Sequence, residues 1–154
     1  TIFILRLLLL YFLKSNKENF EIDYYRSIHC LSQLNLSNVV RMSFINLFSE
    51  KSKCDYKAEI QNALNDALKT PLQGYIACQE GMRIRPNRMT VLKNSSFKKM
   101  FILGKKDPVL SLKKGIEEAQ ETQSETVVLL GGHMSHIENT NNLKAAIRAF
   151  IKLC

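Results

Sequence analysis

Two short apolar runs, each followed at once by a polar turn, constrain the fold of this chain more than any other feature. The first is Met100–Leu103, followed by Gly-Lys-Lys-Asp-Pro, and the second is Thr126–Leu130, followed by Gly-Gly-His-Met-Ser-His. Apolar runs of this length, bounded by turn residues, are typical of buried strands. The segment from Ser111 to about Gln120 has the length of one helix, so this order predicts strand, helix and strand of a parallel sheet.

This arrangement predicts a site at the carboxyl ends of the two strands, where open α/β sheets bind their ligands. Asp107 follows the first strand and His133 the second. An Asp that orients a His, which then acts as a base, makes up two of the three members of a nucleophilic triad. We therefore predict that Asp107 and His133 are catalytic, although Asp107 alone would be typical of a turn and His133 alone of a surface loop.

Three neighbouring features have smaller predicted roles. Gly131 and Gly132 would let the backbone make the turn that directs the ring of His133 toward the site. Glu138 is expected to support this loop or the start of the last helix, rather than to act as a second acid. His136 is expected to line the pocket, and the isolated His29 receives no role.

The two motifs resemble the C-terminal half of the α/β-hydrolase family. Phe101–Pro108 is similar to the family's strand and acid, and Val127–Glu138 to its strand and histidine, in the family's order. The resemblance covers about Ser43 to Cys154. It implies an α/β fold in which lid helices precede the strand–helix–strand–helix of a parallel sheet, as the C-terminal part of an α/β-hydrolase.

The same resemblance implies a division of the chain into three parts. Residues 1–42 would be a poorly matching N-terminal or lid segment, 43–96 lid and connecting helices, and 97–154 the core that carries the acid and the histidine.

Local patterns add detail to these helices. They predict an apolar helix over Val39–Phe48, a break at 49–53, and a helix with Asp55 as its N-cap. They also predict a helix with Thr70 as N-cap and Pro71 at its first position. The last helix is expected to bury a stripe made of Leu143, Ile147, Phe150 and Ile151.

The nucleophile that would complete the triad is missing from the sequence. A nucleophile elbow needs glycines on both sides of the serine, and no glycine occurs from Thr1 to Gln73. We therefore expect an incomplete or truncated chain that is inactive as it stands. Its parent enzyme would hydrolyse a small ester or related acyl substrate. Two alternatives stay open: an epoxide hydrolase or haloalkane dehalogenase type, and a non-catalytic interaction module or decayed gene product.

The charge and cysteine content exclude several other classes. The net charge is +8, but the basic residues occur as dispersed pairs among glutamates without a basic helix face, so no nucleic-acid partner is expected. The four cysteines lack metal-ligand spacing, so we expect free thiols in the cytoplasm, with no metal and no cofactor. They are Cys30, Cys54, Cys78 and Cys154.

The apolar run Ile2–Leu13 is interrupted by Arg6 and is shorter than the roughly 20 residues that a membrane-spanning helix needs. We favour a buried core segment, with an interfacial segment as the alternative, so a membrane partner is not expected.

Overall fold

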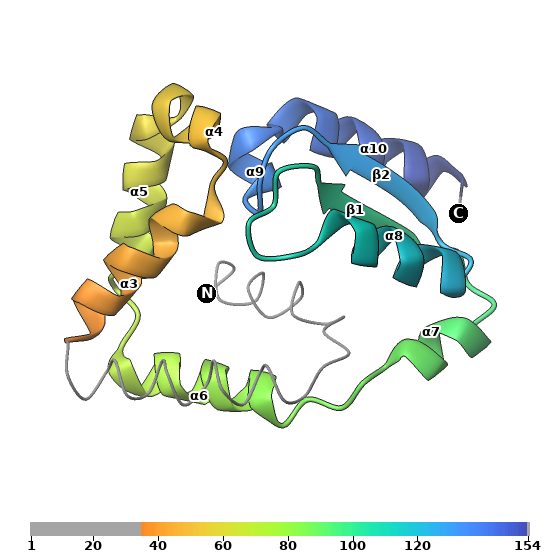
Figure 1. Ribbon diagram of the computed structural model, residues 1–154, viewed down its shortest axis with the longest axis horizontal. Coiled ribbons are helices and arrows are strands. Elements are labelled where there is room, and N and C mark those ends of the chain that lie inside the picture. Colours follow the sequence, from red (N-terminus) through yellow and green to blue (C-terminus); the bar gives the residue numbers. More distant parts are fainter. Residues whose placement is uncertain (1–34, 154) are drawn as a thin grey trace. The chain divides into compact units, whose positions relative to one another are not determined.

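The computed structural model describes residues 35–153, and this part of the chain is a helix-rich α/β structure with a two-stranded parallel sheet (Figure 1). The predictions for residues 1–34, including Ile2–Leu13, His29 and Cys30, and for Cys154 fall outside the described residues. The elements in chain order are α3 (Leu36–Phe44), the 3-10 helix η2 (Ile45–Leu47), α4 (Glu50–Asp55), α5 (Lys57–Ala67), α6 (Leu72–Arg83), α7 (Met89–Asn94), β1 (Met100–Gly104), α8 (Leu112–Glu121), β2 (Glu125–Leu129), α9 (Ser135–Glu138) and α10 (Thr140–Leu153).

The described chain forms two compact units. One contains residues 35–44 and 62–88, and the other contains residues 45–61 and 89–153. The second unit holds the whole sheet and both predicted catalytic residues. The division inferred from the family resemblance, at residues 43 and 97, stays a prediction.

The predicted strand–helix–strand order is confirmed. β1 and β2 pair in parallel, in a register that runs from Met100 opposite Glu125 to Gly104 opposite Leu129. Between them, α8 begins after Ser111, whose side chain accepts a hydrogen bond from the backbone N–H of Lys114. A serine in this position satisfies one of the free N–H groups of the first turn, which is why the helix starts there.

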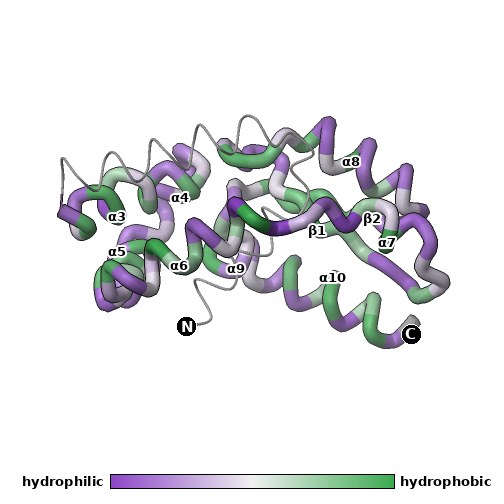
Figure 2. The backbone as a smooth tube through the Cα atoms, turned by 90° about the horizontal axis from the view of Figure 1, so that it is seen from below, coloured by the Kyte–Doolittle hydropathy of each residue, from purple (hydrophilic) through white to green (hydrophobic). Residues whose placement is uncertain are grey.

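The sheet lies between α8 and α10 (Figure 2). On the α8 side, a Cβ at Gly115 would stand 2.7 Å from Cδ2 of Leu103. The helix can lie this close to β1 because Gly115 has no side chain. On β2, Leu129 is only 4% exposed, and Leu143 of α10 is 8% exposed. These residues form the small core that holds the strand ends in place.

The predicted buried stripe of α10 is confirmed only in part. Leu143 is buried and Phe150 half-buried, but Ile147 is 39% and Ile151 65% exposed. Hydrophobic and hydrophilic residues alternate along α10 (Figure 2), yet a two-stranded sheet offers too little area to cover the apolar face of a 14-residue helix.

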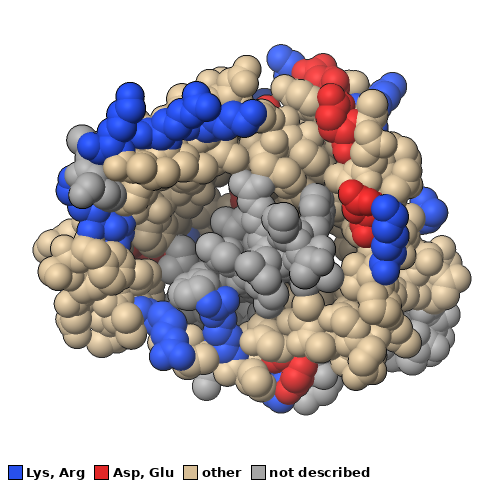
Figure 3. All heavy atoms as spheres, turned by 180° about the vertical axis from the view of Figure 1, so that it is seen from behind, with Lys and Arg blue, Asp and Glu red and all other residues tan. Residues whose placement is uncertain are grey.

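The charge pattern also differs from the prediction. On the face seen in Figure 3, Lys and Arg side chains form several separate groups, some of them next to Asp and Glu, as the dispersed pairs imply. However, α10 does carry a basic face, because Lys144, Arg148 and Lys152 are all exposed and stand four residues apart. The expectation of no basic helix face is therefore wrong for this helix, and the spacing of its basic residues already indicates that face in the sequence.

Several helix starts differ from the predictions. The break expected at 49–53 is confined to residues 48–49, because Ser49 caps α4 by accepting from the N–H of Ser52 and the helix begins at Glu50. Asp55 ends α4 and is not an N-cap. At α6 the N-cap is Pro71, extended at ψ 151°, and not Thr70. Within the described residues, no helix has both the length and the apolar character needed to cross a membrane.

Candidate active site

The structure brings together the two residues that the sequence predicts as catalytic. Nδ1 of His133 lies 2.8 Å from Oδ2 of Asp107, and the side chains are 2% and 6% exposed. Each residue follows one of the two paired parallel strands. The predicted hydrogen bond is therefore confirmed, while the catalytic roles stay predictions.

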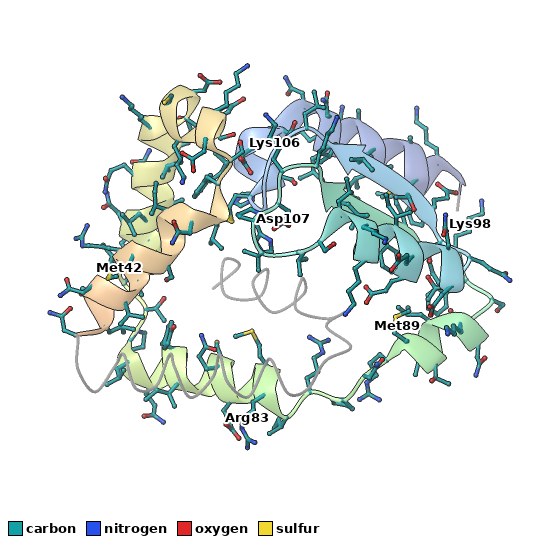
Figure 4. The ribbon with its side chains drawn as sticks, viewed as in Figure 1. Met42, Arg83, Met89, Lys98, Lys106 and Asp107 are labelled. Atoms are coloured by element: carbon teal, nitrogen blue, oxygen red, sulfur yellow. The ribbon has the colours of Figure 1, made fainter. Side chains whose placement is uncertain are left out.

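Asp107 is held by the loop that follows β1, where it is labelled beside Lys106 in Figure 4. Its Oδ1 accepts hydrogen bonds from the backbone N–H groups of Val109 at 2.8 Å and Leu110 at 2.9 Å. These are the bonds of a turn aspartate. Because they use only one oxygen, Oδ2 remains for His133, and the turn role and the orienting role coexist in one side chain.

Backbone hydrogen bonds join the loop after β1, residues 105–111 (the acid loop), to the loop after β2, residues 130–134 (the histidine loop). The N–H of Lys105 donates to the carbonyl of Leu129 at 2.7 Å, and the N–H of Lys106 donates to the carbonyl of Gly131 at 3.0 Å. They continue the pairing of the strands into the loops. The spacing between Asp107 and His133 is thus set by backbone geometry as well as by the side chains.

The pairing assigns the tautomer of His133. An ionised carboxylate can only accept, so Nδ1 carries a hydrogen, and in the neutral imidazole Nε2 then presents its lone pair. Nε2 is buried and has no hydrogen-bond partner among the residues that the structure describes. Leaving a buried acceptor unpaired costs about 1–3 kcal/mol. Nε2 is thus available to accept a proton from a donor that lies within hydrogen-bond distance of it.

The glycines around the histidine are required for a different reason than predicted. No glycine of the chain has a positive φ, so none of them is there for backbone freedom. Instead, a Cβ at Gly132 would stand 2.8 Å from the backbone nitrogen of Ser49, and one at Gly131 would stand 2.8 Å from Cβ of Glu138. A Cβ at Gly104 would overlap the carbonyl oxygen of Gly132. These glycines allow three backbone segments to approach closely.

Glu138 supports the histidine loop, as predicted. Its side chain is buried, and Oε2 accepts from the N–H of Met134 at 3.1 Å. Its Oε1 accepts from the N–H of Ser49 at 2.9 Å, a contact across 89 residues that no sequence pattern signals. His136 lies half-buried on α9, and its predicted place in a pocket wall stays a prediction.

In the described residues, no group of three or more His, Cys, Asp or Glu side chains could hold a metal ion. Cys54 is an exposed free thiol and Cys78 a half-buried one.

Comparison with known proteins supports the fold. No protein-family model and no curated protein sequence matches the chain. Among solved structures, it is similar to a thermophilic esterase from Thermogutta terrifontis, studied with malate bound, with a TM-score of 0.78 and 20% identity. The match covers 87% of this chain and 50% of the esterase, so the chain spans about half the length of that protein. At this identity the likeness shows the fold alone: the chain folds like part of an esterase.

Proposed function

We propose that this chain carries the acid and histidine of an α/β-hydrolase site, and that its parent activity is the hydrolysis of a small ester or related acyl substrate. The observation that carries the proposal is the buried Asp107–His133 pair at two parallel strand ends, with Nε2 of His133 unpaired among the described residues. Similarity to an esterase fold supports it.

In the parent enzyme, Nε2 of His133 would take the proton of a serine hydroxyl as the serine oxygen bonds to the acyl carbon. Asp107 would stabilise the imidazolium through its bond to Nδ1. The imidazolium would then give this proton to the oxygen of the leaving alcohol as the carbon–oxygen bond breaks, leaving an acyl-serine. Water would repeat the sequence, with its proton passing through Nε2, and release the acid.

The chain as given should be inactive, since its sequence contains neither a nucleophile elbow nor the glycine-dependent loop that donates to an oxyanion. We expect the purified chain to hydrolyse 4-nitrophenyl acetate no faster than its His133→Ala variant. Turnover that depends on His133 would reveal a nucleophile that the sequence patterns do not signal.

The coding DNA upstream of Thr1 provides the decisive test. If it encodes a Gly-x-Ser-x-Gly elbow, the longer polypeptide should be an esterase, and His133→Ala or Asp107→Asn should lower kcat by about 10³-fold or more. If the elbow residue is Asp, the epoxide hydrolase or dehalogenase type is favoured.

The alternative is a non-catalytic protein that keeps the scaffold as an interaction module. Upstream DNA without an elbow, together with a wild-type chain that is inactive, would support this alternative.

A further inference from the structure

We propose that Glu138 is a positioning residue for His133. Its carboxylate accepts hydrogen bonds from the backbone N–H of Met134, next to His133, and from that of Ser49. It thereby joins the segment 47–49 to the histidine loop. The proposal uses the proposed function only in treating His133 as the proton-transfer residue.

Both oxygens of the Glu138 carboxylate are used by backbone donors. Oε1 accepts from Ser49 at 2.9 Å and Oε2 from Met134 at 3.1 Å, and the residue is 6% exposed. Hydrogen bonds to an ionised acceptor are about twice as strong as those between neutral groups. A carboxylate used in this way joins two backbone segments that are far apart in the sequence.

A third hydrogen bond closes the arrangement. The N–H of His133 donates to the carbonyl of Leu47 at 3.0 Å. The backbone is therefore held at His133 by Leu47 and at Met134 by Glu138, while Glu138 also holds Ser49, two residues beyond Leu47. A Cβ at Gly132 would stand 3.1 Å from Oε2 of Glu138, so the packing leaves little room for this loop to shift.

This arrangement matters for the catalytic pair because the partner of His133 is fixed separately. Asp107 is held by the N–H groups of its own loop, at Val109 and Leu110. The 2.8 Å bond from Nδ1 to Oδ2 then depends on where the backbone places the imidazole. Glu138 controls that placement without touching the ring's reactive nitrogen.

The test follows the Nδ1 proton of His133 by NMR in the ¹⁵N-labelled chain of residues 1–154, and Asp107→Asn identifies its resonance. In Glu138→Gln the amide offers one oxygen where the carboxylate offers two, so one N–H loses its acceptor. We expect the resonance to broaden or shift, and its exchange with water to rise about tenfold, as the loss of one hydrogen bond to a charged acceptor implies.

Two variants of Ser49 form a matched pair. Both Ser49→Ala and Ser49→Pro remove the hydroxyl, and the φ of −66° at Ser49 suits proline. Only proline also replaces the N–H by a ring carbon, which removes the donor and displaces the Glu138 carboxylate from it. We expect Ser49→Pro to alter the Nδ1 resonance as Glu138→Gln does, and Ser49→Ala to leave it unchanged. This pair decides the question if Glu138→Gln fails to fold.

A variant that only weakens the fold serves as the control. Ile60, 6% exposed, lies on α5, and Ile60→Ala should lower the thermal midpoint without altering the resonance. An unchanged resonance and exchange rate in folded Glu138→Gln and Ser49→Pro would overturn the proposal. An inactive chain that shows the expected changes would support it even if the hydrolase function were wrong.

Discussion

At the scale of single residues, Glu118 is the buried acid that the candidate site does not use. It is 7% exposed on α8, and its Oε1 has no hydrogen-bond partner within the described part of the chain. Burial raises the pKa of this carboxyl above its ordinary value; Lys114 opposes the shift, while Glu121 and Glu117 add to it. An acid with a raised pKa in the folded state stabilises the fold most below its unfolded pKa, and this contribution is lost as pH rises through the folded value.

Glu118→Gln should therefore stabilise the chain at pH 7, because a neutral amide replaces a buried charge. We expect a gain of about 1–2 kcal/mol in the free energy of unfolding. Below about pH 4 the wild-type carboxyl is protonated in both states, and the gain should disappear. Urea unfolding at pH 7 and pH 3.5 measures both values. Glu59→Gln on α5, at an exposed side chain that does not contribute to this shift, should change little at either pH. A gain for Glu118→Gln that is the same at both pH values would contradict this account.

The cysteines permit a second prediction at this scale. Burial raises the pKa of the Cys78 thiol, while Cys54 is exposed. Since the thiolate is the reactive form, iodoacetamide at pH 8 should label Cys54 several-fold faster than Cys78. Mass spectrometry of peptides taken over time measures both rates. In urea the two rates should converge, and equal rates in the folded chain would show that the burial of Cys78 is not maintained.

At the scale of elements, close approach between the ends of β1 and β2 decides the geometry of the site. Gly104 ends β1, and a Cβ there would overlap the backbone carbonyl of Gly132, which cannot move aside as a flexible side chain can. Gly81 in α6 offers a contrast, since a Cβ there would meet nothing within 4 Å.

Gly104→Ala should thus destabilise the chain by about 1–3 kcal/mol, because inserting an atom into a packed contact shifts the backbone. Gly81→Ala should stabilise it by about 0.5–1 kcal/mol through helix propensity. Chemical denaturation of both variants at pH 7 gives the two values. The NMR resonance of the His133 Nδ1 proton should change only in Gly104→Ala. A stable Gly104→Ala variant with that resonance intact would mean that the strand ends lie further apart than described.

At the scale of the whole molecule, the sheet is small for the apolar surface that accompanies it. Among the described residues β1 pairs only with β2, so the stability of this sheet depends on the helices that pack against it. Leu130, just after β2, is 67% exposed, and Ile151 of α10 is 65% exposed. Open strand edges and exposed apolar groups promote association.

We expect the purified chain to associate as its concentration rises, which sedimentation velocity measures. Ile151→Glu should weaken this association, since it places a charge on the exposed apolar side of α10. Ile84→Glu is the matched control, because Ile84 is also 65% exposed but lies in the other unit, and it should have less effect. A monomer at all concentrations that unfolds cooperatively would show that the chain is a self-sufficient domain.

The sequence determined the strand–helix–strand order and the pairing of Asp107 with His133. Apolar runs bounded by turn residues are local signals, and parallel strands joined by one helix bring their carboxyl ends to the same edge. The same reasoning located α8, and the structure adds that Ser111 is its N-cap. Local patterns were less reliable for α4, which was predicted as a break, and for α6, where Thr70 and Pro71 compete as caps at adjacent positions.

Only the tertiary structure decided what surrounds the pair. The hydrogen bond from Ser49 to Glu138 and that from His133 to Leu47 join segments more than 80 residues apart, and no periodicity records such contacts. The reason for the glycines was likewise invisible, because close approach depends on the neighbour that a Cβ would meet and not on the glycine itself. The exposure of Ile147 and Ile151 follows from the area of the sheet beneath α10, which is a property of the assembled fold.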